Sequence, residues 1–245
     1  AMTFNGTSST NGAGVNRYGI NLTGASTQVS SGGNIICTGT GGTNDGGIGI
    51  LVADGAELST SGAGTLTTTG TGGSGGASSS GVKVTGTNSK IETENGAFSM
   101  TGTTSGTGST CHGIYISDSG LVSSIGSGAV ALDGTGADAA SCSGIYIISA
   151  GSVTSTSATA GEGNITLTGT GNIDSHGIAV EGTNTKVHSV GGNASLIGTS
   201  LGVTSSACLL YTSDAADDSL RVDLGGRRII KKRHVQRPVG DRLTQ

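Results

Sequence analysis

The sequence has few of the residues that usually build a globular core. Aromatic residues make up 2% of the 245-residue chain, tryptophan is absent, and charged residues make up 11%. The one proline is Pro238, so every residue before it can donate a backbone hydrogen bond. No apolar stretch resembles a transmembrane span, and the 48 glycines alone would favour disorder. These absences leave a disordered chain or a repeat protein, and periodicity must decide between them.

A repeating unit favours order. It occurs six times, and each copy opens with a glycine that two alternating apolar residues follow. The opening glycines are placed at Gly19, Gly47, Gly81, Gly113, Gly144 and Gly177, at intervals of 28 to 34 residues. The alternating pairs are Ile20/Leu22, Ile48/Ile50, Val82/Val84, Ile114/Ile116, Ile145/Ile147 and Ile178/Val180. Six copies in phase are typical of a repeat architecture.

Two further apolar segments follow in every copy. The second contributes a single apolar residue, namely Val29, Leu58, Ile91, Val122, Val153 and Val187. The third alternates and closes on Gly-Thr, at Gly39-Thr40, Gly70-Thr71, Gly102-Thr103, Gly134-Thr135, Gly169-Thr170 and Gly198-Thr199. An earlier, truncated copy closes at Gly6-Thr7. Alternation with period two predicts short strands with one buried face, and Gly and Asn are expected at the positive-φ corners between them.

One copy cannot fold by itself. Burying roughly five aliphatic side chains contributes on the order of 10 kcal/mol, at about 1.5–3 kcal/mol each. Ordering about thirty residues costs several times more, at roughly 1–2 kcal/mol per residue. Copies must therefore stack so that equivalent side chains form continuous internal columns. The sequence predicts an all-β fold, a parallel β-solenoid of about six coils, each with roughly 32 residues and three short strands.

The chain divides into three parts. Residues 1–18 are predicted to be the end of a preceding coil and a loop, residues 19–207 the solenoid, and residues 208–245 a disordered, non-native tail. Within the tail, 208–217 and 222–231 resemble translated sequencing-library adapters, which implies read-through over residues 208 to about 232. The tail has a formal charge of +3 and the rest of the chain −7, so the charge composition also changes at residue 208. We assign no nucleic-acid binding to its basic run.

The cysteines divide by position. Cys111 and Cys142 each stand two residues before an opening glycine on consecutive coils. Stacked positions are expected about 4.8 Å apart, within the Cα separation that a disulfide allows. A disulfide and two small corner residues are both open interpretations, and a disulfide would imply an oxidising compartment. Cys37 falls on an inward column and is predicted to be a buried free thiol, whereas Cys208 belongs to the tail.

Some polar and aromatic residues also recur in columns. Tyr115 and Tyr146 are predicted to point outward on adjacent coils, where they could stack a glycan, although cross-strand packing is the default. His112 and His176 share a column two coils apart, too far for one metal ion, and are expected on the loop surface. Glu57 and Lys90 share a column on adjacent coils as a solvated pair. No metal site or cofactor is predicted.

Two alternative functions make different demands on these columns. A carbohydrate-active β-helix enzyme, or its accessory domain, needs carboxylates that converge at one groove, but the acids fall in different columns, among them Asp118, Asp133, Glu162 and Asp174. We therefore predict no catalytic residue. Thr-Gly-Thr recurs at 38–40, 69–71, 101–103 and 168–170, and threonine ranks can order water and bind ice. Asp133 and Ile197 interrupt this rank, which is expected at a corner, so ice binding is a minor alternative.

The unit Gly-Ile-x-Val … Lys-Val-x-Ser … Leu-x-Gly-Thr, as in residues 177–199, resembles the repeats of bacterial filamentous-haemagglutinin and autotransporter-passenger adhesins. The resemblance spans residues 1–207. It implies a right-handed β-helix that is secreted or displayed on the bacterial outer surface and acts as an adhesin or spacer. Its expected partners are host or matrix glycans and proteins, with no membrane insertion by this segment. Open solenoid ends are expected to self-associate.

Overall fold

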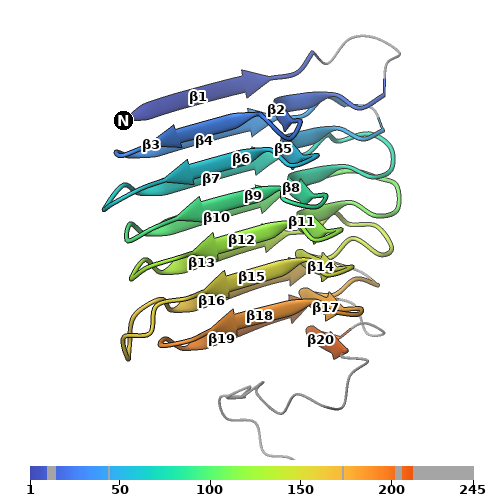
Figure 1. Cartoon of the computed structure of the whole chain (residues 1–245). Helices are drawn as coiled ribbons and strands as arrows, with labels where there is room; N and C mark the ends of the chain where they lie inside the picture. The colour runs from blue at the N-terminus through green and yellow to red at the C-terminus, as the bar shows by residue number, and fades with distance from the viewer. Residues whose placement is uncertain (10–14, 44, 173, 202–205, 212–245) are drawn as a thin grey trace, which may run out of the picture.

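The computed structural model describes residues 1–9, 15–43, 45–172, 174–201 and 206–211. Within these ranges the protein is an all-β solenoid with three parallel sheets, three strands per coil and about 32 residues per coil (Figure 1). No helix among the described residues has the length and hydropathy needed to span a bilayer. The predicted fold class is confirmed. The predicted adapter read-through covers residues 208 to about 232, of which residue 212 onward lies outside the described residues.

Each sheet collects one strand from every coil. Sheet A contains β1 (Met2–Thr7), β4 (Ile35–Thr40), β7 (Leu66–Thr71), β10 (Phe98–Thr103), β13 (Val130–Thr135), β16 (Ile165–Gly171) and β19 (Ala194–Ser200). Sheet B contains β2 (Tyr18–Thr23), β5 (Ile48–Ala53), β8 (Ser80–Thr85), β11 (His112–Ser117), β14 (Ile145–Ile148), β17 (Ile178–Glu181) and β20 (Cys208–Tyr211). Sheet C contains β3 (Gln28–Ser31), β6 (Glu57–Thr60), β9 (Lys90–Thr93), β12 (Leu121–Ser124), β15 (Ser152–Ser155) and β18 (Lys186–Ser189).

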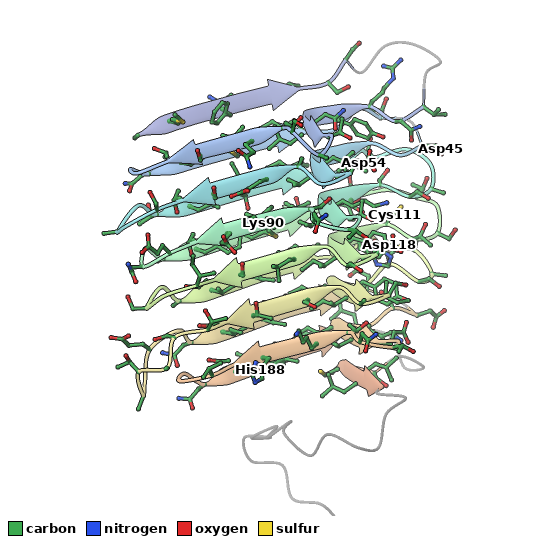
Figure 2. The ribbon with its side chains drawn as sticks, in the orientation of Figure 1. Asp45, Asp54, Lys90, Cys111, Asp118 and His188 are labelled. Atoms are coloured by element: carbon green, nitrogen blue, oxygen red, sulfur yellow. The ribbon has the colours of Figure 1, made fainter. Side chains whose placement is uncertain are left out.

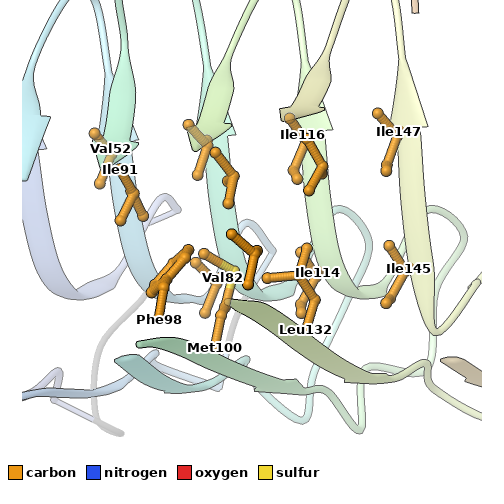
Figure 3. Close-up of a cluster of buried hydrophobic side chains, with 14 of the residues drawn as sticks. Val52, Val82, Ile91, Phe98, Met100, Ile114, Ile116, Leu132, Ile145 and Ile147 are labelled. Atoms are coloured by element: carbon orange, nitrogen blue, oxygen red, sulfur yellow. The ribbon is translucent and has the colours of Figure 1, made fainter. Parts of the chain in front are cut away.

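The core consists of side-chain columns that run along the stack. Ile114 pairs with Ile145 and Ile116 with Ile147, and all four side chains are fully buried (Figure 3). Phe98 and Met100 of sheet A fill the same interior from the opposite side. The single apolar column of sheet C, from Val29 to Val187, is in register on every coil. Stacking of equivalent residues therefore builds the core that one coil lacks.

The last residues of each sheet A strand lie against the first residues of sheet B, and we call this close backbone approach the glycine neck. Its members are Gly39, Gly70, Gly102, Gly134 and Gly169 of sheet A, Gly49, Gly81 and Gly113 of sheet B, and Gly144 and Gly177, which directly precede β14 and β17. A Cβ added to Gly102 would lie 2.2 Å from the carbonyl oxygen of Gly113. One added to Gly113 would lie 2.4 Å from the backbone nitrogen of Thr135. Only glycine permits this approach of two backbones.

The neck corrects one predicted register. Ile20 pairs with Ile50 and Ile50 with Val82, so the opening glycine of the second copy is Gly49 and not Gly47. Residues 48–52 form a nearly continuous apolar run, in which a period of two fits either of two frames. The neck removes this ambiguity because a Cβ added to Gly39 would lie 2.1 Å from the Gly49 carbonyl oxygen. The inward pair on β5 is therefore Ile50 and Val52, both fully buried.

The corners use more residue types than glycine and asparagine. Asn88 and Asn184 have positive φ as predicted, but so do Asp54, Asp118 and Ala150. A short polar side chain can offset this conformation by local hydrogen bonding, and Asp118 accepts such a bond from the adjacent Ser117 at 3.0 Å. Ala150 has φ 62° and no polar side chain to offset it.

Strand pairing continues past the predicted boundary at residue 207. β20 pairs in parallel with β17, with Cys208 opposite Ile178 and Leu210 opposite Val180. Cys208 packs against the end of the core. The prediction of disorder from residue 208 is therefore wrong for residues 208–211. This apolar tetrapeptide pairs with the edge of β17.

Candidate functional site

The outward-facing side chains of the three sheets differ, and the loops from sheet A to sheet B form a fourth region on one side of the stack. In Figure 2, Cys111 lies toward this loop side, whereas Lys90 lies away from it. Alternation places every second residue of a strand outside. These outward residues, together with the loops, are where the chain can meet a ligand.

Sheet C carries a charged cluster centred on Lys90. Its ammonium lies 3.4 Å from Glu57 on the preceding coil and 3.1 Å from Glu92 on its own strand. Burial would lower the pKa of Lys90, but hydrogen bonding to Glu92 and the charges of both carboxylates outweigh it and raise the pKa. Ser123 donates a hydrogen bond to Glu92 at 2.8 Å. The predicted pairing of Glu57 with Lys90 is confirmed, and the arrangement keeps Lys90 protonated.

Next to this cluster lies a groove of about 270 Å³. Its lining includes Ser30, Ser59, Glu92, Glu94 and Ile125. The carboxylate of Glu94 accepts a hydrogen bond from the backbone of Gly62 at 2.7 Å. The groove can therefore offer hydroxyl and carboxylate groups around one exposed aliphatic side chain.

Sequence reasoning missed the contributions of Glu92 and Glu94 to this groove. A signal was present, because Lys90, Glu92 and Glu94 alternate with Ile91 and Thr93 and so share the outward face. Considering Glu57 and Lys90 as an isolated pair concealed that the next outward positions are also acidic.

Sheet B carries the predicted tyrosine pair. The rings of Tyr115 and Tyr146 stack with centroids 5.6 Å apart and planes inclined by 10°. The ammonium of Lys83 lies 5.0 Å from the centroid of Tyr115, and the hydroxyl of Tyr146 donates a hydrogen bond to Glu181. Burial, followed by this hydrogen bond, raises the pKa of Tyr146. Lys83, Tyr115 and Tyr146 pair in register on β8, β11 and β14, and Glu181 lies on β17 opposite Ile148, two residues beyond the position that pairs with Tyr146. We call these four residues the tyrosine column.

His112 supports the tyrosine column from within the stack. Its ring centroid lies 5.1 Å from that of Tyr115 and 4.7 Å from that of Tyr146. The expectation that His112 lies on the surface is wrong, since its side chain is buried. Burial, and secondarily the charge of Lys83, lowers the pKa of His112 to about 3, so the ring is neutral. Its Nδ1 accepts a hydrogen bond from the backbone of Ser143 at 3.1 Å.

The outer face of sheet A consists mainly of threonine. One outward column is threonine in all seven strands, namely Thr7, Thr40, Thr71, Thr103, Thr135, Thr170 and Thr199. The adjacent column contains Thr38, Thr69, Thr101 and Thr168, with Asn5, Asp133 and Ile197 as interruptions. The sequence placed these threonines at a corner, and that placement is wrong. They belong to strands because each Gly-Thr pairs in register with the Gly-Thr of the coil above and of the coil below.

The two loop cysteines lie together on the loop side. Cys111 and Cys142 are both fully buried free thiols that pack with Ala137. The backbone amide of Cys111 donates a hydrogen bond to the sulfur of Cys142 at 3.1 Å. Cys37 is also a buried free thiol, as predicted, and burial raises its pKa to about 11.

Among the described residues, no group of three or more His, Cys, Asp or Glu side chains is arranged to hold a metal ion. Comparison of the chain with known protein families, with curated proteins and with solved structures finds no match. Functional inference therefore rests on the four regions described above.

Proposed function

We propose that this chain is part of an extracellular or bacterial cell-surface β-solenoid, a non-catalytic adhesin or spacer that presents its outer faces to glycans or matrix proteins. The observation that carries the proposal is the separation of roles within each strand. Inward residues form one uninterrupted core from coil to coil, whereas outward residues differ from sheet to sheet. A rod of this kind gains length by adding coils and can vary its surface without loss of the fold.

The charged cluster supports a non-catalytic reading of sheet C. A lysine that abstracts a proton near neutral pH needs a lowered pKa, whereas that of Lys90 is raised. The carboxylates of Glu57 and Glu92 are both engaged by its ammonium. Incubation with acidic and neutral polysaccharides should release no new reducing ends and no unsaturated sugars. Release that Lys90→Met abolishes would favour the enzyme alternative.

The tyrosine column supports glycan contact. Tyr146 combines a partly exposed aromatic ring with a hydroxyl bound to Glu181, and Lys83 adds a cation on the same face. Aromatic and charged groups placed in this way suit sugars, which present both C–H faces and hydroxyls.

A glycan array probed with the whole chain tests this contact. Tyr146→Ala should weaken binding about threefold to tenfold, the range expected for one aromatic contact. Thr154→Ala, on the outer face of sheet C, is the matched control and should leave binding unchanged. Equal binding by both variants, or no glycan binding by the wild type, would contradict the proposal.

The threonine face favours a second candidate, the binding of ordered water or ice. Its columns repeat about every 4.8 Å along the stack and about every 6.7 Å along each strand, because parallel strands and alternate residues set these spacings. Asp133 is the one charge among the described outward positions of sheet A. A regular, nearly neutral grid of hydroxyl and methyl groups suits a water lattice better than a charged polymer.

An ice-recrystallisation assay separates this candidate from the first. The wild type should limit crystal growth, Thr69→Lys should lose the effect, and Thr154→Lys on sheet C should retain it. Equal crystal growth with and without the wild type would remove the second candidate and leave the first untouched.

The two ends of the stack also offer surfaces for self-association. β1 is an edge strand of sheet A, and its Met2 and Phe4 side chains are exposed. At the other edge, Ile197 of β19 is exposed. Unpaired strand edges flanked by apolar side chains pair readily with one another. Sedimentation should show concentration-dependent oligomers, and a single monomeric species over the whole concentration range would contradict this expectation.

A further inference from the structure

The loops between sheets A and B bring two thiols from neighbouring coils together. Cys111 directly precedes His112 of β11, and Cys142 directly precedes Ser143 on the next coil. Backbone hydrogen bonding continues through this region, since Gly113 donates to Ser143 at 3.1 Å. The cysteines are therefore held at about the spacing of parallel strands, 4.7–4.9 Å, which lies within the Cα separation of disulfides.

The surroundings of the sulfurs place each one against the preceding coil. The sulfur of Cys142 accepts the amide hydrogen bond of Cys111 at 3.1 Å and lies 3.3 Å from the carbonyl oxygen of Gly108, to which its thiol donates. The thiol of Cys111 donates to the carbonyl of Gly76 at 3.5 Å. A Cβ added to Gly106 would lie 2.6 Å from the sulfur of Cys111, so this sulfur has room because residue 106 is glycine.

Cys37 provides the contrast within the same molecule. It is buried in the main core, and its neighbours in the column are Phe4 and Thr68. Among the described residues, the two loop cysteines are therefore the ones that stacking pairs with each other. The difference is one of position, because all three thiols are buried and free.

We propose that Cys111 and Cys142 form a reactive dithiol that closes to a disulfide between adjacent coils, by exchange with a low-molecular-weight disulfide such as oxidised glutathione. The thiolate of Cys111 attacks one sulfur of the small disulfide, whose S–S bond breaks and releases one small thiolate. Cys142 loses its proton to solvent, and its thiolate attacks the sulfur of Cys111. The second small thiolate then leaves. The protein loses two electrons, and the small disulfide gains them as it becomes two thiols.

Electrostatics supports this order of attack. Coupling between the two neighbouring thiols lowers the pKa of Cys111 and raises that of Cys142. Cys111 is therefore the thiol that ionises more readily, which favours it as the attacking group. Because both side chains are fully buried, we expect exchange to occur during local opening of the loop side, once the two loops already lie side by side. The inference does not depend on the proposed adhesive function.

Refolding of the whole chain in glutathione buffer, followed by peptide mapping without reduction, tests the proposal. We expect one cross-linked peptide that joins Cys111 to Cys142. Cys142→Ser should stop the reaction at a glutathione adduct on Cys111, whereas Cys111→Ser should leave Cys142 unmodified. Cys37→Ser is the matched control and should leave the cross-link intact. The thermal midpoint of the oxidised chain should exceed that of the reduced chain by roughly 5–15 °C.

Two results would overturn the proposal. One is the absence of a Cys111–Cys142 peptide from correctly folded, fully oxidised protein. The other is an adduct that forms on Cys142 while Cys111 stays free. Cys111→Ala and Cys142→Ala repeat the test if a serine variant fails to give the wild-type circular dichroism spectrum.

Discussion

The two sides of each strand obey different rules. On the inner side the residue type is nearly constant from coil to coil, with aliphatic columns in the core and glycine in the neck. On the outer side the same strands carry threonine on sheet A, a tyrosine column on sheet B and a charged cluster on sheet C. The inner side is fixed because stacking must bury every coil against the next. The outer side can diverge, and recognition is therefore expected there.

The largest loss of stability is expected from an added methyl group in the glycine neck. Gly102→Ala places a Cβ 2.2 Å from a backbone oxygen, and no flexible side chain there can move aside. We expect a loss of more than about 4 kcal/mol or failure to fold. Gly32→Ala is the control, since its Cβ would meet only the hydroxyl of Ser61, at 3.8 Å. Urea unfolding measures the stability of both variants, and equal stability would contradict the claim that only glycine fits in the glycine neck.

Truncating one buried and one exposed isoleucine tests which side of each strand faces the core. Ile114 is fully buried, whereas Ile125 is 52% exposed beside the groove. Ile114→Ala should lower the free energy of unfolding by about 2–5 kcal/mol because it leaves a cavity. Ile125→Ala should change it by about 0.5 kcal/mol or less. A loss at Ile125 as large as that at Ile114 would show that the assigned inward face is wrong.

A corner substitution should stabilise the protein. Ala150 has φ 62°, a conformation that costs an L-residue roughly 1–2 kcal/mol. Ala150→Gly removes this strain but adds backbone entropy to the unfolded chain, so a net gain of about 0.5–1 kcal/mol is expected. Calorimetry on the variant and the wild type measures the gain, and a loss would mean that the corner is not left-handed at this residue.

The smallest effect is expected at Lys90. An exposed ion pair contributes about 0.2–1 kcal/mol, so Lys90→Met should cost no more than this and less at high salt. Because the folded pKa is raised, the contribution is present below the unfolded pKa of about 10.4 and disappears as pH rises through the folded value. The wild type and the variant should therefore have the same free energy of unfolding at pH values above the folded pKa of Lys90. A difference that persists there would mean that Lys90 acts through packing.

Stacking explains why most of the fold could be predicted from the sequence. Inward columns recur because each must match the coil above and below, and the closing Gly-Thr pairs in register from Gly6 to Gly198. The register of residues 48–52 was predicted wrongly because an alternation of period two fits a continuous apolar run in either of two registers. The glycine neck selects the register, and it is a contact between two backbone segments that no pattern within one copy reveals.

The outer faces could be predicted only in part. Tyr115 and Tyr146 were found because they occupy equivalent places in consecutive copies, and the structure places them in contact. The groove beside Lys90 depends on Glu92 and Glu94 meeting residues two coils away, such as Ser30. The burial of His112 depends on two tyrosines that cover it. Neither arrangement follows from the pattern within one copy.

Distances between nitroxide labels on the unbroken threonine column test the in-register stack most directly. Labels at Thr40 and Thr199, in a chain whose native cysteines are replaced by serine, are separated by five strand spacings in sheet A. Pulsed electron paramagnetic resonance should give a narrow distribution near 24 Å, and labels at Thr71 and Thr199 one near 19 Å, because each coil adds about 4.8 Å. Broad distributions, or distances that do not fall by one strand spacing between the two pairs, would contradict the solenoid.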